Sequence, residues 1–338
     1  MCGIVGLPNV GKSTLFNTLL KKQTALVANY PFATIEPNVG VVEVPDERLP
    51  VLAKIVNTQK IVPAVVEFYD IAGLVKDASK GEGLGNQFLA NIREVSAIVH
   101  VVRFFEEDNV THVTNKVDPL SDIQTIEEEL MLADLQTLDK QHEPKGNAEE
   151  EVATFKLVQQ VKEKLNAGTA VYHQALTTKQ QQMIKHLNLL TQKAVIFAFN
   201  CSLEQLENQQ ETTLKVQTIL QQSNGKDTNF LLFNPLLEET VGELITKAYS
   251  TLGLISFLTA GQKEVRAWTI AKGTTAQQAA GLIHTDFATH FIKADVVPYP
   301  KFVALGGWNP AREQGAVSSE GKDYLVRDGD VIEFKVNV

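Results

Sequence analysis

The sequence predicts an α/β protein with a doubly wound sheet, an inserted helical hairpin and a small α+β module in its last 85 residues. Three observations predict this organisation. A glycine-rich phosphate-binding motif lies between an apolar run and a helical pattern, apolar strand-like runs stop near residue 121 and resume near 191, and short β-rich runs follow residue 254. A length of 338 residues suits two or three domains.

The phosphate-binding motif occupies residues 6–13, which read GLPNVGKS and fit the pattern G-x-x-x-x-G-K-[ST] at every required position. Residues 1–5 predict a buried strand before it, and the apolar spacing over 14–20 predicts a helix after it. Glycines let backbone N–H groups approach phosphate oxygens, and the helix N-terminus favours negative charge. The nucleotide-binding residues predicted here are Asn9, Val10, Gly11, Lys12, Ser13 and Thr14.

The other sheet elements follow from apolar runs and helical spacing. Strands are expected at 39–44, 64–69, 97–105, 194–199 and 230–233, and helices at 48–56, 87–95 and 241–252. The 97–105 run is almost wholly apolar, which predicts a central buried strand.

The segment between these halves has helical period. Residues 121–137, 152–165 and 180–190 predict helices with a coiled-coil-like seam, and residues 127–129 are expected to be exposed. Acidic residues outnumber basic residues two to one over 124–166. Two interpretations stay open, a solvated antiparallel hairpin, which the composition favours, and an arm that docks a partner.

Residues 253–261 are interpreted as a boundary. Beyond it, strands are expected at 264–270, 302–305 and 331–338, and a helix at 275–283. The predicted domains are therefore a nucleotide-binding domain over 1–121 and 191–253, a helical insertion over 122–190, and a C-terminal module over 254–338.

Composition limits the partners. A net charge of −9 argues against charge-driven nucleic-acid binding, and no direct DNA binding is expected. No apolar run reaches the roughly 18 residues of a membrane span, so no membrane partner is expected. Cys2 and Cys201 are far apart and are interpreted as reduced thiols, which together with the lack of a signal peptide predicts a cytoplasmic protein.

A phosphate-binding loop needs groups from other strand ends. Asp70 follows the 64–69 run, where its carboxylate can hold Mg²⁺, and Gly73 can offer its N–H to a γ-phosphate. Thr34 lies in a proline-containing loop that can close on the metal when a triphosphate is bound. The predicted metal ligands are thus Ser13, Thr34 and Asp70, with Lys12 and Gly73 acting on the phosphates.

The residue after Gly73 is Leu74, where many GTPases carry a glutamine that orients the attacking water. Hydrolysis must then orient its water differently. The candidates are backbone groups, a cation such as K⁺ near Asn9, and His112 in the loop over 106–115. His112 is therefore the candidate catalytic side chain, although a loop histidine is more often solvated.

Two stretches compete as the base-recognition site. Residues 115–118 read NKVD, a guanine-recognition pattern, but only nine residues separate them from the 97–105 strand, too few for a crossover with its helix. The alternative is the end of the 194–199 strand, with Asn200, Cys201 and Ser202. This site offers no acidic partner for guanine at the expected position, so guanine selectivity is unsupported.

The chain resembles the YchF subfamily of Obg-related P-loop NTPases over nearly its whole length. The resemblance is carried by residues 6–13, by NYPFATIEPN at 29–38, DIAGLVK at 70–76, GEGLGNQFL at 81–89 and NVTHV at 109–113, and by FLTAG, EVRAW and EGKDY near 257, 264 and 320. It implies a nucleotide-binding domain, a helical hairpin and a ubiquitin-like TGS domain. It also implies a preference for ATP over GTP, slow hydrolysis, association with ribosomes, and a catalytic role for His112.

Three departures from the family pattern affect the base site and its surroundings. The family motif is Asn-x-x-Glu, but here Leu203 is at the third position after Asn200 and Glu204 follows it. Residues 233–236 read FNPL where the family has a Ser-Ala or Cys-Ala run, and Asp77 replaces a usual glycine.

The sequence therefore predicts a slow Mg²⁺-dependent ATPase that acts as a nucleotide-dependent switch on the ribosome. The alternatives are a nucleotide-gated binding protein with negligible catalysis and a GTPase, with GTP as a second accepted nucleotide.

Overall fold

A computed structural model describes residues 1–23, 38–71, 84–106, 117–144, 146, 148–223 and 229–337. Contacts divide the described residues into two compact units. The first lies within 1–21, 34–40 and 67–244, and the second within 22–33, 41–66 and 245–338. Across these described ranges, we find no helix with the length and apolar character that a bilayer crossing requires.

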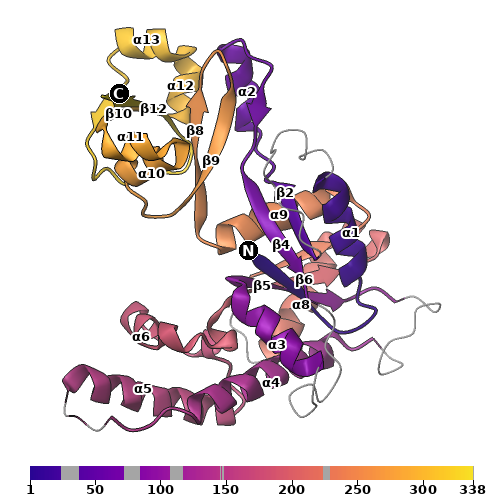
Figure 1. The fold of residues 1–338 in the computed structure, drawn as a ribbon. Helices are drawn as coiled ribbons and strands as arrows, with labels where there is room; N and C mark the ends of the chain where they lie inside the picture. The colour runs from indigo at the N-terminus through magenta and orange to yellow at the C-terminus, as the bar shows by residue number, and fades with distance from the viewer. Residues whose placement is uncertain are drawn as a thin grey trace. The chain divides into compact units, whose positions relative to one another are not determined.

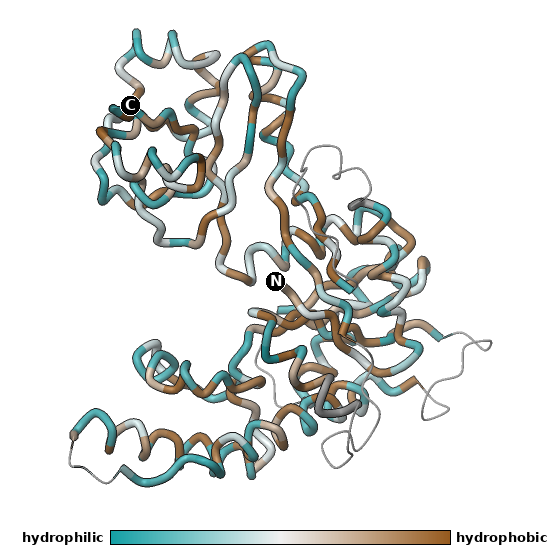
Figure 2. The backbone as a smooth tube through the Cα atoms, viewed as in Figure 1, coloured by the Kyte–Doolittle hydropathy of each residue, from teal (hydrophilic) through white to brown (hydrophobic). Residues whose placement is uncertain are grey.

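The six-stranded sheet that carries the phosphate-binding loop belongs mainly to the first unit (Figure 1). Its order is β2 (Val39–Glu43), β4 (Val65–Asp70), β1 (Cys2–Val5), β5 (Ala97–Arg103), β6 (Ala194–Asn200) and β7 (Phe230–Phe233). β1 pairs in parallel with β4 and β5, and β5, β6 and β7 continue the parallel ladder. All seven residues of β5 are buried, as expected for a central parallel strand, and Figure 2 shows the hydrophobic character of this sheet.

Helices connect and cover these strands. They are α1 (Lys12–Gln23), α3 (Leu84–Glu94), α7 (Leu203–Glu207), α8 (Gln209–Gln222) and α9 (Glu238–Thr251). Ile123 and Val216 pack with Val102, Phe199 and Leu232 in one core cluster, so helical residues cover β5, β6 and β7 on one side. The paired helices α7 and α8 lie in a region for which the sequence predicted no helix.

The helical insertion starts with α4 (Pro119–Leu138) and continues with α5 (Glu149–Asn166) and α6 (Thr178–Ile184). Three short 3₁₀ turns, η1 (Val171–His173), η2 (Lys185–Leu187) and η3 (Leu190–Gln192), complete it. A separate apolar cluster, with Leu138, Val161 and Ile184 among its members, holds these elements together. The single helix expected over 180–190 was wrong, because Asn188 takes a left-handed conformation with φ 49° and the chain turns there.

The acidic face of α4 also differs from expectation. Glu128 is exposed as predicted, but Glu127 and Glu129 are buried. Glu127 accepts a hydrogen bond from the Tyr172 hydroxyl at 2.6 Å. Asp134, with no exposed surface, accepts from the backbone N–H groups of Leu190 and Thr191 at 2.7 and 2.8 Å. Some of the acidic residues of the insertion are therefore buried acceptors that stabilise it from within.

The second unit contains a mixed sheet. Its order is β11 (Ser318–Glu320), β10 (Phe291–Pro298), β12 (Asp330–Val336), β8 (Leu254–Ala260), β9 (Val265–Ala271) and β3 (Ile61–Val62). β8 and β12 pair in parallel, while β9 and β10 flank them in antiparallel pairs. The helix α10 (Ala276–Ile283) packs its alanines against this sheet. A parallel central pair between antiparallel neighbours with a crossing helix is the ubiquitin-like arrangement.

Two expectations for this unit were wrong. Residues 254–260, interpreted as part of a boundary, form the strand β8. Residues 302–305, expected as a strand, belong to the helix α12 (Tyr299–Leu305). Pro300 in the first turn and Gly306 at φ 82° after the last turn mark its two ends, and they outweigh a four-residue apolar run. Two further short helices are α11 (Thr285–Thr289) and α13 (Trp308–Glu313).

The segment 41–66 groups with residues 245–338 by contacts, which the sequence did not indicate. Its helix α2 (Arg48–Ile55) packs beside β9, and β3 pairs in parallel with β9. Arg48 bonds to Asp46 and to Asp328, both at 2.8 Å. The domain boundaries expected from the sequence stay a prediction.

Candidate functional site

The phosphate-binding loop connects β1 to α1 and has little spare room. Gly6, Asn9 and Gly11 have φ values of 153°, 63° and 100°. A Cβ atom on Gly6 would lie 2.4 Å from the Val101 carbonyl oxygen, and one on Gly11 would lie 2.3 Å from the Asn200 amide nitrogen. Larger side chains are therefore excluded by both conformation and contact.

Lys12 is the charged centre of the loop and is only 7% exposed. Its ammonium group donates to the Leu7 carbonyl at 2.7 Å. Burial lowers the pKa of Lys12 to about 8, and the nearby carboxylate of Asp70 opposes that shift. Burial likewise raises the pKa of Asp70, with Lys12 acting in the other direction. The charges of Lys12 and Asp70 therefore act on one another across the loop.

His100 on β5 is 2% exposed and faces the same interior. Burial, followed by the charge of Lys12, lowers the pKa of His100 to about 3. The imidazole is therefore neutral at physiological pH and adds no second positive charge behind the loop.

Asn200, the last residue of β6, ties three segments together. Its side-chain amide donates to the Val10 carbonyl at 3.0 Å. Its backbone carbonyl accepts from the N–H groups of Phe104 and Phe105 at 2.9 and 3.1 Å. The buried Asn200 side chain thus fixes the phosphate-binding loop to the ends of β5 and β6.

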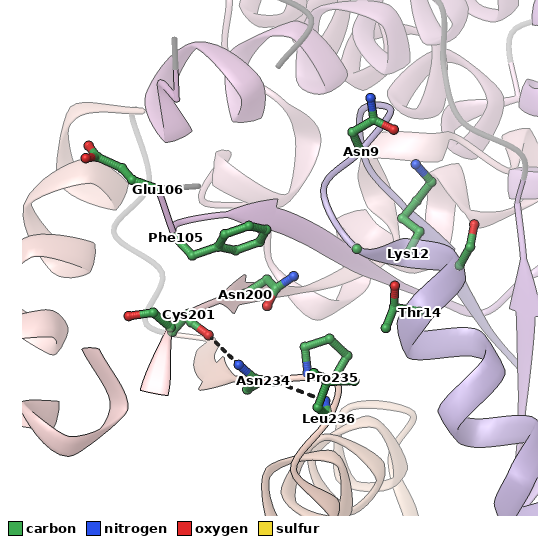
Figure 3. Close-up of a pocket in the computed structure, with 13 residues that line it drawn as sticks. Asn9, Lys12, Thr14, Phe105, Glu106, Asn200, Cys201, Asn234, Pro235 and Leu236 are labelled. Atoms are coloured by element: carbon green, nitrogen blue, oxygen red, sulfur yellow. Dashed lines mark hydrogen bonds between the residues drawn. The ribbon is translucent and has the colours of Figure 1, made fainter. Parts of the chain in front are cut away.

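A cavity of about 580 Å³ opens along these strand ends. It is lined by Asn9, Gly11, Lys12, Ser13, Thr14, Phe105, Glu106, Asn200, Cys201, Ser202, Asn234, Pro235 and Leu236. Figure 3 shows Lys12 and Asn9 at one end, with Phe105 and the 234–236 loop at the other. Pockets at the carboxyl ends of parallel strands are where open α/β sheets bind ligands, and this volume is typical of small-molecule sites.

The end of the cavity away from Lys12 is shaped for a flat apolar group. The Arg103 guanidinium lies 4.5 Å from the ring centre of Phe105. Across from Phe105, the amide of Asn234 donates to the Cys201 carbonyl at 2.8 Å and accepts from the Leu236 N–H at 3.0 Å (Figure 3). Leu236 is 77% exposed. A ring, a fixed loop and backbone polar groups are the features that bind a nucleobase.

The structure brings together most of the predicted nucleotide-binding residues. Asn9, Gly11, Lys12, Ser13, Thr14, Asn200, Cys201 and Ser202 line the cavity, whereas Val10 lies behind it and presents its carbonyl to Asn200. Asp70 ends β4, whose residues pair in parallel with β1. The predicted residues His112, Gly73 and Thr34, and Leu74 beside them, lie outside the described residues.

The two competing base-recognition motifs lie in different positions relative to the cavity. Asp118, the last residue of the guanine-like pattern, caps α4 by accepting from the Ser121 N–H at 3.1 Å and does not line the cavity. Asn115 and Lys116 lie outside the described residues. On the other motif, Ser202 caps α7, and Leu203 and Glu204 are exposed residues of that helix that do not line the cavity.

Sequence reasoning missed five lining residues, namely Phe105, Glu106, Asn234, Pro235 and Leu236. Their positions in the sequence could have indicated them, because each follows the strand β5 or β7. Those strands end at the same edge of the sheet as the phosphate-binding loop. In the sequence, the 233–236 run stands out only as a departure from a family pattern.

The donor set near Lys12 fits Mg²⁺. The described residues hold no group of three or more His, Cys, Asp or Glu side chains able to cage a metal. Mg²⁺ does not need one, since it binds through one or two protein oxygens, water and substrate phosphates. The Ser13 hydroxyl and the Asp70 carboxylate are oxygens of that kind.

Comparisons with known proteins agree with this geometry. Residues 1–133 match a family model described as "50S ribosome-binding GTPase", and residues 254–337 match one for the C-terminal part of YchF GTPases, described as a protein of unknown function. The "Ribosome-binding ATPase YchF" of Bacillus subtilis is 44% identical over 99% of both chains. The chain belongs to the YchF family. The protein of the same name from Haemophilus influenzae is also 44% identical, over 100% of this chain and 99% of its own.

A solved structure gives the same result for the fold. The Schizosaccharomyces pombe YchF GTPase superimposes with a TM-score of 0.85 at 33% identity, covering 99% of this chain and 97% of its own. The predicted fold class is therefore confirmed, as is the resemblance to YchF proteins. The names of these relatives differ in one respect, since the bacterial relatives are called ATPases and the yeast protein a GTPase.

Proposed function

We propose that this YchF protein is a slow ATPase that acts as a nucleotide-dependent switch on the ribosome, in the cytoplasm. The observation that carries the proposal is the continuous cavity with Lys12 and Ser13 at one end and Phe105 and Leu236 at the other. A nucleotide bound along this cavity would have its phosphates on the loop and its base near Asn200. The bacterial relatives named as ribosome-binding ATPases support the same assignment.

The chain's own residues would hold the phosphates and the metal. Lys12 would exchange its bond to the Leu7 carbonyl for bonds to the β- and γ-phosphates. Ser13 and Asp70, together with Thr34, would hold Mg²⁺, which neutralises charge on the phosphates. Gly73 would donate to the γ-phosphate and His112 would orient the water, because Leu74 cannot. K⁺ near Asn9 is a second candidate cation.

We expect ATP to be favoured over GTP because Glu204 does not line the cavity, and among the described residues the one carboxylate in its lining is that of the exposed Glu106. Titration with mant-ATP and mant-GTP tests this preference. We expect tighter binding of ATP. Tighter binding of GTP would overturn the adenine assignment and favour the name that the yeast structure carries.

A second candidate is a nucleotide-gated binding protein with negligible catalysis, which Leu74 favours. Phosphate release with and without ribosomes and K⁺ separates it from the ATPase. A rate that is lost in His112→Ala supports the enzyme, whereas equal traces for the variant and the unmodified protein support the binder.

Ribosome association is tested by co-sedimentation with a non-hydrolysable ATP analogue. Pelleting that depends on the nucleotide supports a switch. The helical insertion over 122–190 and the module over 254–338 are the proposed contact regions, so deletion of 142–188 should reduce pelleting without abolishing nucleotide binding. Absence of pelleting in every nucleotide state would contradict the ribosomal role.

A further inference from the structure

A second cavity, of about 650 Å³, lies in the first unit at the other ends of β5 and β6. Ser96, just before β5, and Ala194, which starts β6, line it, whereas Arg103 and Asn200 end these strands beside the nucleotide cavity. Seven strand residues span about 20 Å at about 3.3 Å per residue. The two cavities are therefore separate sites connected by two paired strands.

The lining of this second cavity is basic and rich in amides. Arg93, Lys185 and Lys193 contribute three positive charges, and Glu94 is its one carboxylate. Within the described ranges, no carboxylate lies at ion-pair distance from any of the three cations. The amide side chains are those of Gln181, Gln182, Asn188 and Gln192.

The cations are partly held in place by the surrounding backbone. The Lys193 ammonium donates to the carbonyls of Arg93 and Val95 at 3.0 and 2.6 Å, and to the Asn188 side chain at 3.3 Å. The Arg93 guanidinium donates to the Asn188 carbonyl at 3.3 Å and to the Thr137 hydroxyl at 3.1 Å. The left-handed turn at Asn188 thus receives bonds from both cations.

The three cations differ in how many N–H donors they have left for a ligand. Lys193 has its three N–H groups committed, so it contributes charge but no further hydrogen bonds. The bonds of Arg93 to Asn188 and Thr137 use two of its five N–H groups, which leaves donors for a ligand. Lys185 is exposed at the rim, where its flexible side chain can close on an anion.

We propose that this second cavity, formed by α3, α6, η2 and η3, binds a small phosphorylated molecule. The lining carries a net charge of about +2, which matches a phosphate monoester at about −1.5 to −2. A guanidinium fork is the side chain best suited to phosphate oxygens, and the amides suit a polar organic part. A polynucleotide instead needs basic residues along an extended face, and here they converge in one cavity of small-molecule size.

The test uses the full chain with its phosphate-binding loop saturated by Mg²⁺ and a non-hydrolysable ATP analogue, so that an added phosphate cannot bind at Lys12. Phenyl phosphate and inorganic phosphate are the probes, and benzoate is the control for an aromatic anion without phosphate. Binding is followed by saturation-transfer NMR. We expect saturable binding of phenyl phosphate about tenfold tighter than that of benzoate.

Variants locate the site. Lys185→Gln should weaken phenyl phosphate binding about fivefold, and Arg93→Lys, which keeps the charge but loses the fork, should weaken it by a similar factor. Lys179→Gln is the matched control, because Lys179 is an exposed lysine on α6, the helix that directly precedes Lys185, and it does not line the cavity. It should leave binding unchanged.

Inorganic phosphate separates two sources of the ligand. Equal affinity for both probes would identify free phosphate as sufficient, and tighter binding of phenyl phosphate would show that the organic part contacts the amides. Either result supports the proposal. Absence of saturable binding, equal binding of benzoate, or equal effects of Lys185→Gln and Lys179→Gln would overturn it. None of these readouts depends on ATP hydrolysis.

Discussion

At the residue scale, the charge of Lys12 makes nucleotide binding depend on pH. Burial lowers the pKa of Lys12 to about 8, whereas an exposed lysine titrates near 10.4. The ammonium must be charged to bind phosphates, so affinity should fall as pH rises above about 8, by up to about tenfold per pH unit. Mant-ATP titrations between about pH 7 and 9.5 measure this slope.

Folding stability depends on pH in the opposite direction to nucleotide affinity. Because the unfolded chain keeps the Lys12 proton to a higher pH than the folded chain, the contribution of this group to stability rises between about pH 8 and 10. Lys12→Arg, whose charge persists across this range, serves as the control and should bind weakly but without the slope. A flat affinity profile for the unmodified protein would contradict the lowered pKa.

Asn200 gives a second prediction at this scale. Its amide is bound to the Val10 carbonyl, so Asn200→Ala should loosen the phosphate-binding loop and weaken ATP and GTP equally, by about tenfold or more. Equilibrium binding of both mant-nucleotides measures the ratio. Asn208→Ala, which removes an exposed amide bonded within the α7 region, is the control. A change in the ATP to GTP ratio would show instead that Asn200 reads the base.

At the element scale, one buried carboxylate organises the helical insertion. Asp134 on α4 accepts from two backbone N–H groups and from the Thr191 hydroxyl, the last at 2.6 Å. Asp134→Asn would replace one of the two accepting oxygens by an NH₂ group, which cannot accept a hydrogen bond from these donors. We expect a loss of about 2 to 3 kcal/mol in the free energy of unfolding, since hydrogen bonds to buried charges are strong.

Hydrogen exchange and urea unfolding measure this loss, and exchange should rise first in η3. Asp139→Asn is the matched control, because Asp139 lies at the end of the same helix in an exposed pair with Lys162. It should cost less than about 0.5 kcal/mol. Equal effects of the two variants would rule out a special role for Asp134.

The elements also show how far the sequence could lead. The strands of the first sheet were predictable because buried parallel strands are continuous apolar runs, and the position of Asp70 at a strand end followed from the same signal. The run at 302–305 was ambiguous, since four apolar residues suit a helix or a strand. The burial of Glu127 and Asp134 was not predictable, because their partners Tyr172 and Thr191 are distant in sequence.

One end of the candidate site could be predicted from the sequence and the other could not. A contiguous motif predicted the phosphate end, with Lys12 and Ser13. The base end depends on which loops meet at one edge of the sheet, so Phe105 and Leu236 became visible only with the strand order β1, β5, β6, β7.

At the scale of the whole molecule, the pairing of 41–66 with the C-terminal module makes a prediction about independent folding. The helix α2 buries Leu49 and Leu52, and β3 pairs with β9. A fragment ending at residue 253 lacks β9, so α2 and β3 lose a partner. We expect residues 48–62 in that fragment to lose hydrogen-exchange protection and the fragment to aggregate, because its buried apolar side chains become exposed.

A second fragment isolates the cause. The Val44 N–H donates to the Ala64 carbonyl at 2.8 Å, so the residues on either side of the segment 45–63 are hydrogen-bonded neighbours. That segment can therefore be replaced by a short Asn-Gly turn. A fragment of 1–253 with this replacement should remain monomeric and bind mant-ATP. Full protection of 48–62 in the first fragment would show that this segment folds without β9, and aggregation of both fragments would place the instability elsewhere in the first unit.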